Sequence, residues 1–141
     1  MERTDIQIAK EHLGKNNNVL VIVKNGKVLF KSTKNGIQPF FDALNKLPRK
    51  SYFGCSVADH VVGKAALMLA AYIGAKEIFT PLASQHAVDA SLNLELELNT
   101  GQIVPYIINR THDGMCPMEK AVLNIDEPEN AYHVLKIKLQ N

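Results

Sequence analysis

The residues most able to do chemistry stand together near the carboxyl end of the chain, in the segment Cys116-Pro117-Met118-Glu119. Proline favours the first position of a helix, so this segment predicts a helix start with Cys116 as its cap. The positive end of a helix dipole favours the nucleophilic thiolate there, while Glu119 has the spacing of a capping box. The functional interpretation is a reactive Cys116, and the alternative is a cysteine that serves as a weak cap.

A second group of candidates opens an apolar run in the middle of the chain. Asp59 is expected to begin a helix over residues 59–73, either as a general base or ligand contact or as a cap that interacts with the helix dipole. Gly63 would lie inside that helix at a cost of about 1 kcal/mol against alanine, which indicates close packing or close approach of a ligand. Lys64 is expected to pair with Asp59 or Glu119, and a plain surface lysine is the alternative.

Three further polar residues complete the predicted site. Arg110 and His112 lie in a predicted loop before Cys116, where Arg110 suits a carboxylate or phosphate and His112 could be a base or ligand. Ser84 is expected to cap a short helix. Two cations suit an anion and two carboxylates can move protons, so we expect a small anionic or nucleotide-like ligand. The expected catalytic residues are Cys116, Asp59 and Glu119, and the expected ligand-binding residues are Lys64, Arg110, Ser84 and Gly63.

The elements that must position these residues follow from apolar periodicity and turn residues. A helix capped by Thr4 or Asp5 precedes a hairpin with strands at 19–24 and 27–32, joined by Asn25-Gly26. Further helices are expected to begin near Pro39, Asp59, Ser84, Cys116 and Asp126, further strands at 51–56, 77–80 and 94–98, and an extended segment at 104–108. This order implies a mixed α/β sheet with helices on both faces. Ligands bind outside the carboxyl ends of parallel strands in such sheets, here residues 55–59 and 80–84.

Composition excludes several classes of protein. The 141 residues suit a single domain over 1–141, and a net charge of +2 is too small to favour nucleic acid or an anionic membrane as a partner. The longest apolar stretch, 65–75, is too short to cross a bilayer. The chain start has no apolar signal core, and Cys55 and Cys116 are far apart without CxxC partners. We therefore expect a cytoplasmic protein with two free thiols, Cys55 being a small core residue.

Two longer motifs carry a resemblance to a known family. The first spans residues 56–66 and contains Asp59 before Val-Val-Gly-Lys-Ala-Ala, and the second joins Asn109-Arg110 to Cys116-Pro117-Met118-Glu119. With the hairpin and the order of elements, they resemble the domain-of-unknown-function family 1893 over nearly the whole chain. The resemblance implies a cytidine-deaminase-like fold, a three-layer α/β/α sandwich around a mixed sheet of about five strands. By analogy with deaminases it also implies a homodimer, but it implies no activity.

The zinc motif of the deaminases is missing from the expected places. Zinc deaminases need a His or Cys two residues before a Glu at one helix start, and Pro-Cys-x-x-Cys at the next. This chain has Asp59-His60-Val61 at the first place and Pro81-Leu82-Ala83-Ser84 at the second. We therefore expect no metal and no other cofactor. If the protein is an enzyme, we expect that it is not a zinc-dependent deaminase.

Three functional interpretations stay open at this point. The leading one is a non-zinc site that binds a small molecule, with thiol chemistry at Cys116. The first alternative is a metal-dependent hydrolase with the ligands Cys55, His60, His112 and Cys116. The second alternative is a binding or interaction domain that has the fold without catalysis.

Overall fold

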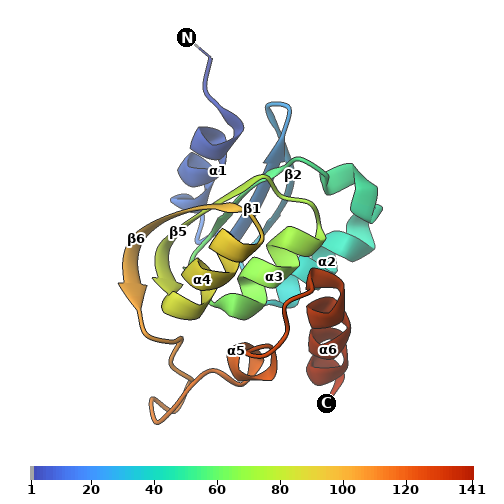
Figure 1. The fold of residues 1–141 in the computed structure, drawn as a ribbon. Coiled ribbons are helices and arrows are strands. Elements are labelled where there is room, and N and C mark those ends of the chain that lie inside the picture. Colours follow the sequence, from blue (N-terminus) through green and yellow to red (C-terminus); the bar gives the residue numbers. More distant parts are fainter. Residues whose placement is uncertain (1) are drawn as a thin grey trace.

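The fold is a mixed β-sheet with helices on both faces, seen in a computed structural model that describes residues 2–141 (Figure 1). The sheet order is β2-β1-β3-β5, with both β4 and β6 paired to β5. The helices are α1 (Asp5–Leu13), α2 (Gln38–Lys46), α3 (Lys64–Tyr72), α4 (Gln85–Asn93), α5 (Pro117–Ala121) and α6 (Pro128–Gln140), with a 3-10 turn at Arg49–Tyr52. The strands are β1 (Leu20–Lys24), β2 (Lys27–Ser32), β3 (Ser56–Asp59), β4 (Val61–Val62), β5 (Glu77–Ser84) and β6 (Glu97–Val104).

The amino-terminal helix and hairpin form as the sequence predicts. Thr4 caps α1 through a capping box with Gln7. Asn25 and Gly26 both have positive φ, 52° and 79°, as a type I′ turn requires. The Asp5 carboxylate accepts hydrogen bonds from both turn N–H groups, at 2.9 Å and 2.8 Å. The first helix is therefore tied directly to the tip of the hairpin.

Strands β3 and β4 behave as one interrupted strand beside β5. Their pairing has one register, since Ser56 pairs with Glu77 and Val61 pairs with Leu82 in the same parallel direction. The gap at Asp59 and His60 faces the part of β5 that contains Pro81, which has no N–H to donate. With β4 counted as the continuation of β3, the sheet has the five strand positions predicted.

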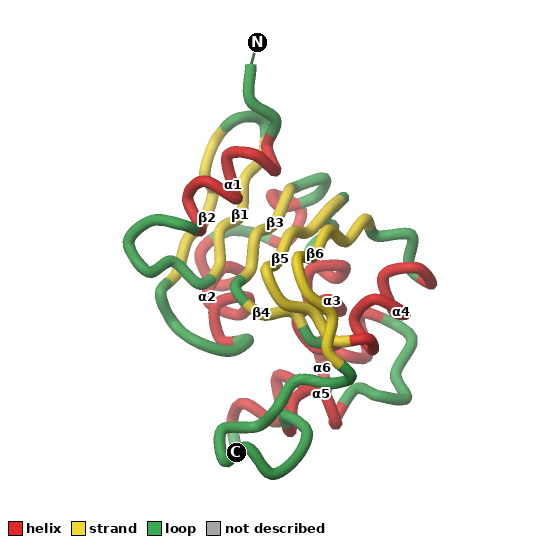
Figure 2. The backbone as a smooth tube through the Cα atoms, turned by 90° about the vertical axis from the view of Figure 1, so that its left-hand side faces the viewer, coloured by secondary structure: helices red, strands yellow, loops and turns green. Residues whose placement is uncertain are grey.

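Two apolar clusters hold the layers together on opposite faces of the sheet. The smaller cluster joins Ala9 of α1 to Val21, Val23 and Ala58. The larger one packs α2, α3, α4 and α6 against the other face. Of these helices, α3 and α4 lie in front of the sheet in Figure 1 and to the right of β5 in Figure 2. The predicted three-layer α/β/α arrangement is therefore confirmed, with a thin layer on one side. No helix among residues 2–141 is long and apolar enough to span a membrane.

The predicted helix start at Asp59 is wrong. Asp59 is the last residue of β3, Gly63 is the N-cap of α3, and the helix begins at Lys64. Val57 and Ala58 before Asp59 and Val61 and Val62 after it are apolar, because this stretch lies in the sheet and then enters a buried helix. Periodicity cannot separate a buried strand from a buried helix in such a run.

Other predicted boundaries are also wrong. A 3-10 turn occupies part of the predicted strand 51–56, and the predicted strand 94–98 begins only at Glu97, because Leu94 and Glu95 close α4. The predicted extended segment 104–108 is not a strand beyond Val104, although Ile108 forms one isolated bridge with Met115. The last helix begins at Pro128, so the predicted cap at Asp126 is wrong too.

Candidate functional site

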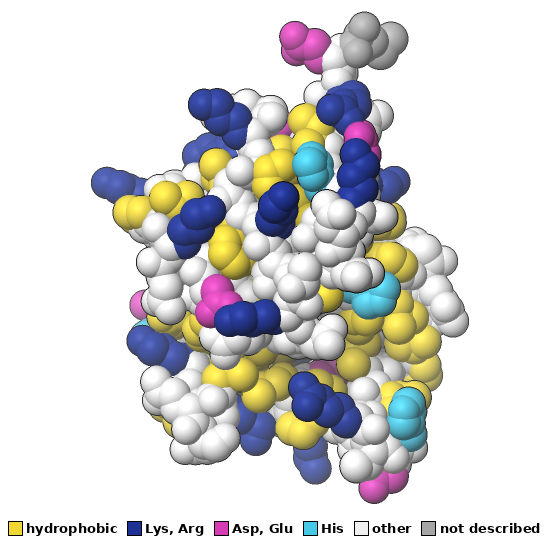
Figure 3. Space-filling model, turned by 180° about the vertical axis from the view of Figure 1, so that it is seen from behind, with side chains coloured by type: hydrophobic (Ala, Val, Ile, Leu, Met, Phe, Trp, Pro, Cys, Tyr) yellow, Lys and Arg dark blue, Asp and Glu magenta, His cyan; other side chains and the backbone are white. Residues whose placement is uncertain are grey.

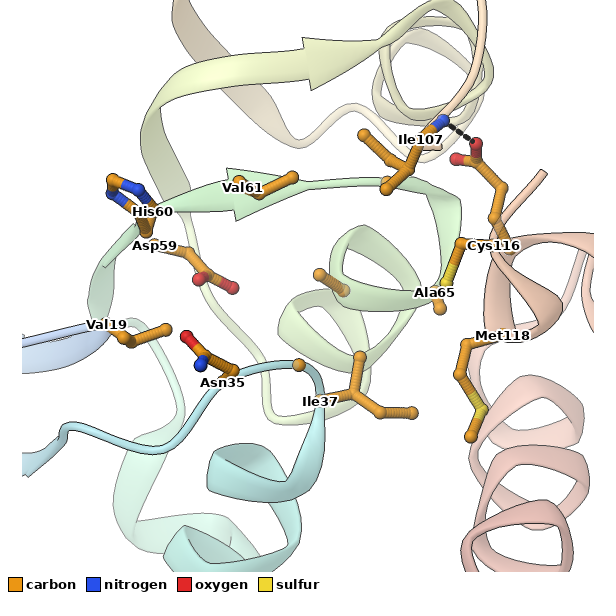
Figure 4. Close-up of a pocket in the computed structure, with 14 residues that line it drawn as sticks. Val19, Asn35, Ile37, Asp59, His60, Val61, Ala65, Ile107, Cys116 and Met118 are labelled. Atoms are coloured by element: carbon orange, nitrogen blue, oxygen red, sulfur yellow. Dashed lines mark hydrogen bonds between the residues drawn. The ribbon is translucent and has the colours of Figure 1, made fainter. Parts of the chain in front are cut away.

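A cavity of about 250 Å³ lies at the carboxyl end of β3, between the start of α3, residues 35–37 and the start of α5 (Figure 4). Aliphatic side chains form most of its wall. The polar side chains that line it are Asn35, Asp59, His60, Cys116 and Glu119. No lysine or arginine is among the described residues that line it. The cavity lies where ligands bind in sheets with parallel strands, outside the carboxyl ends of the strands.

Asp59 is the most unusual polar residue of this cavity. It is only 2% exposed, and burial raises the pKa of its carboxyl well above the ordinary range, although the N–H groups of His60 and Val61 act in the opposite direction. In Figure 4 its carboxyl group points into the cavity, with the side chain of Asn35 beside it. The uncharged carboxylic acid can both donate and accept a hydrogen bond.

Cys116 lies on the opposite wall of the cavity from Asp59 (Figure 4). It is a free, half-buried thiol at the N-cap of α5, and it makes no side-chain cap hydrogen bond. His60, the histidine among the lining residues, lies at the Asp59 end, whereas His112 is exposed in the loop before α5. Cys116 can therefore contact a ligand in the cavity, but no histidine of the described lining stands beside it as a base.

Glu119 joins three distant parts of the chain. Its carboxylate is 1% exposed and accepts hydrogen bonds from the backbone N–H of Lys64 at 2.6 Å, the hydroxyl of Ser84 at 2.5 Å and the backbone N–H of Ile107 at 2.8 Å. The negative charge also stands at the start of α3, where the helix dipole favours it. The predicted capping box with Cys116 is therefore wrong, because both carboxylate oxygens bind donors in other elements.

Gly63 makes this arrangement of Glu119 possible. A Cβ atom at Gly63 would lie 2.7 Å from Glu119 Oε2 and 2.8 Å from Ile107 Cγ1, closer than real side chains approach. The close packing predicted for Gly63 is confirmed, although the glycine caps the helix and does not lie inside it.

Lys64 and Arg110 do not face the cavity. Lys64 Nζ donates to the carbonyl oxygen of Leu123 at 2.8 Å, and this side chain lines a different, more polar hollow beside α4. Arg110 is exposed in the loop after β6. The predicted pairing of the Lys64 ammonium with Asp59 or Glu119 does not form. The structure therefore groups Asp59, Gly63, Cys116 and Glu119 at the cavity, joins Ser84 to them through Glu119, and leaves the two cations outside.

The metal-ligand set considered for a hydrolase is not assembled. Cys55 is fully buried and outside the cavity, and His112 lies in the exposed loop. Within residues 2–141 no three His, Cys, Asp or Glu side chains are grouped so that they could hold a metal ion. The donor set of the zinc deaminases therefore has no counterpart in the described part of this chain.

Sequence reasoning missed the wall contributed by residues 35–37. Asn35, Gly36 and Ile37 all line the cavity, and none of them is among the predicted site residues. An Asn-Gly pair is an ordinary turn signal, and nothing in its sequence indicates that the turn faces a site. Val19 and Met118 were missed for the same reason, because apolar residues next to predicted elements look like ordinary core residues.

The fold and the cavity define an α/β protein with a partly open pocket at the carboxyl end of its parallel strands. The sequence model of the family described as TM1506, domain of unknown function (DUF1893), matches residues 8–139. The chain belongs to this family, as the two motifs predict. No curated protein matches the chain.

A solved structure of the family has the same fold. A DUF1893 family protein (TM1506) from Thermotoga maritima is 23% identical, with a TM-score of 0.85 over 98% of this chain and 92% of that chain. The fold predicted from the family resemblance is therefore confirmed. A dCMP deaminase from the cyanophage S-TIM5, solved in apo form, is 14% identical, with a TM-score of 0.49 over 68% of this chain and 93% of that chain.

Proposed function

We propose that the cavity binds a small, uncharged ring with a hydrogen-bonding edge, and that Asp59 recognises this edge. The observation that carries the proposal is a buried carboxyl group directed into a cavity whose wall is otherwise mainly apolar. A few well-placed polar groups in an apolar pocket are typical of small-molecule sites.

The size of the cavity sets the size of the ligand. An apolar cavity of roughly 150 Å³ holds a benzene molecule, and this cavity measures about 250 Å³. One ring with small substituents fits inside, and the ribose and phosphate of a complete nucleotide would extend out through the open side. A carbonyl group of the ring would accept a hydrogen bond from the protonated Asp59 carboxyl. A ring N–H could donate a hydrogen bond to Asn35 or Asp59.

The charges favour an uncharged ligand over the anion expected from the sequence. Lys64 and Arg110, which motivated the anion, lie outside the cavity. An anion beside Asp59 and Glu119 would be desolvated without a lysine or arginine in the described wall to compensate it. A bound ring would also lie between Asp59 and Cys116, so it would shield the Cys116 thiol.

Titration of the labelled protein with uracil, orotate and UMP, followed by NMR, tests this proposal. Uracil is a neutral ring with carbonyl and N–H groups, orotate adds a carboxylate to the same ring, and UMP adds ribose phosphate. We expect uracil to shift the amide signals of residues 59–63 and to bind at least tenfold more tightly than either anion. Asp59→Leu should abolish this binding, and Asp126→Leu, at a position that does not line the cavity, should preserve it.

Two results would contradict the proposal. Tighter binding of orotate or UMP would restore the anion interpretation. Equal binding of uracil to the Asp59→Leu variant, with its fold intact by circular dichroism, would show that Asp59 does not recognise the ligand.

A further inference from the structure

Strand β6 is an open edge of the sheet. Its eight residues pair with β5 on one side, and within residues 2–141 no other strand pairs with its second side. In Figure 1 it forms the outermost strand, away from α3 and α6. An open edge presents unpaired backbone N–H and C=O groups that another strand can bind.

The two edges of the sheet differ in their protection. The β2 edge contains the exposed lysines Lys27 and Lys31, and edge lysines are a common means of preventing strand pairing. The β6 segment Glu97-Leu-Asn-Thr-Gly-Gln-Ile-Val104 contains no lysine, arginine or proline, and its one charged residue is at its first position. Only the β6 edge therefore lacks the usual protection.

Exposed apolar side chains gather at the same edge. Ile103 is 50% exposed, and the segment that follows β6 contributes Tyr106 at 38% and Ile108 at 55%. Seen from behind, hydrophobic side chains collect along the side of the molecule where β6 lies, at the right in Figure 3. Contiguous exposed apolar surface of this kind marks an interaction site more often than single apolar residues do.

We propose that β6 pairs antiparallel with β6 of a second copy of this chain, about a twofold axis at Gly101. This register places Leu98 opposite Val104 of the second copy, Thr100 opposite Gln102, and Asn99 opposite Ile103. The half-buried residues Leu98 and Val104 then meet on one face of the joined sheet. Glycine at the axis suits a place where two backbones approach each other closely.

Charge also favours a second copy as the occupant. In the antiparallel pair the two Glu97 side chains lie at opposite ends of a strand pair roughly 25 Å long, so no like charges face each other. The strand can therefore pair with itself without charge repulsion and with its apolar side chains matched, as an isologous interface requires.

Sedimentation velocity on the full chain tests the interface and its register. We expect the unmodified protein to sediment with about twice the chain mass of 15.6 kDa. The double variant Asn99→Lys with Ile103→Lys sets lysine opposite lysine twice and should sediment as a monomer. Asn99→Glu with Ile103→Lys sets glutamate opposite lysine and should restore the dimer. Ile137→Lys, an equal change at an exposed position on α6, should leave the dimer unchanged.

The proposal is overturned if the unmodified protein is a monomer at NMR concentrations, which would leave the edge to a strand of another protein. It is also overturned if the double-lysine variant stays dimeric, because the interface then lies elsewhere. A monomeric Asn99→Glu, Ile103→Lys variant with a native circular dichroism spectrum would contradict the stated register.

Discussion

Asp59 shows at the scale of one residue how burial sets the chemistry of a site. Ionising a carboxyl in an apolar wall costs free energy, and the described cavity residues provide no lysine or arginine to compensate it. Burial therefore favours the protonated form of this side chain, which can donate a hydrogen bond. Asp59 is the last residue of β3, directly before the interruption between β3 and β4, and this position directs its side chain into the cavity.

Asp59→Asn should make the free energy of unfolding less dependent on pH. The folded protein holds the Asp59 proton to a higher pH than the unfolded chain does, because burial raises the pKa of this carboxyl. Its contribution to stability is therefore complete below about pH 4, the unfolded pKa, and falls as pH rises toward the folded pKa. The slope is at most about 1.4 kcal/mol per pH unit. Urea unfolding at a series of pH values measures this slope.

The control for this experiment is Asp113→Asn. Hydrogen bonds from Thr111 and Asn109 lower the pKa of the exposed Asp113 carboxyl, so its linkage has the opposite sign. Its stabilising contribution is present above the unfolded pKa and is lost as pH falls. If Asp59→Asn leaves the fall of stability above pH 4 unchanged, Asp59 is not the group responsible for it.

The sequence predicts four of the residues that the structure places at the cavity, and it fails on their partners. Asp59, Gly63, Cys116 and Glu119 stand out by residue type within two short segments, residues 56–66 and 116–119. The partners of Glu119 are 12, 35 and 55 residues away along the chain. Local spacing predicted a bond to the nearby cap instead, because nothing local indicates that three distant donors converge on one carboxylate.

At the scale of elements, prediction succeeds where a turn or cap residue marks a boundary. The Asn25-Gly26 turn, the Ser84 cap and the Pro117 helix start all form as predicted. Prediction from the sequence fails at β6, because this exposed edge strand, with Thr100, Gly101 and Gln102, does not alternate between apolar and polar residues. The alternating Leu and Glu residues before it close α4, since Leu94 and Glu95 complete the last turn of that helix.

Glu119→Gln should destabilise the protein by about 2–3 kcal/mol, because an amide has one acceptor oxygen and leaves a buried donor unpaired. Besides the lower free energy of unfolding, we expect the contacts around Glu119 to loosen, since Glu119 links α5 to the start of α3 and to the residues after β6. Hydrogen exchange of the Ile107 and Lys64 amides should accelerate more than that of β1. Urea unfolding measures the total change.

Glu129→Gln on α6 is the matched control, because Glu129 is highly exposed and should change stability by less than about 0.5 kcal/mol. If Glu119→Gln is equally neutral, the carboxylate does not hold these elements together.

At the scale of the whole molecule, the two cysteines differ in their accessibility to a thiol reagent. Cys55 is fully buried in the larger core, and burial raises the pKa of its thiol to about 12. Cys116 is half-buried at the cavity, so a reagent can reach it without unfolding of the core. The reactivity of Cys116 therefore measures access to the cavity, and the reactivity of Cys55 measures opening of the core.

Iodoacetamide at neutral pH should label one cysteine per native chain, at Cys116, and two per chain in denaturant. Saturating uracil should slow the labelling of Cys116 several-fold, because the bound ring would cover it. Intact mass and peptide mapping give the count and the position. Labelling of Cys55 at the same rate as Cys116 under native conditions would contradict the burial of Cys55.

The unequal edges of the sheet also determine how far association can proceed. In the proposed dimer each copy covers the unprotected β6 edge of the other, and the two β2 edges with Lys27 and Lys31 become the outer boundaries of one continuous sheet. Neither boundary offers a lysine-free strand to a third copy. Assembly through this surface therefore closes at two chains, and it does not propagate into a fibre.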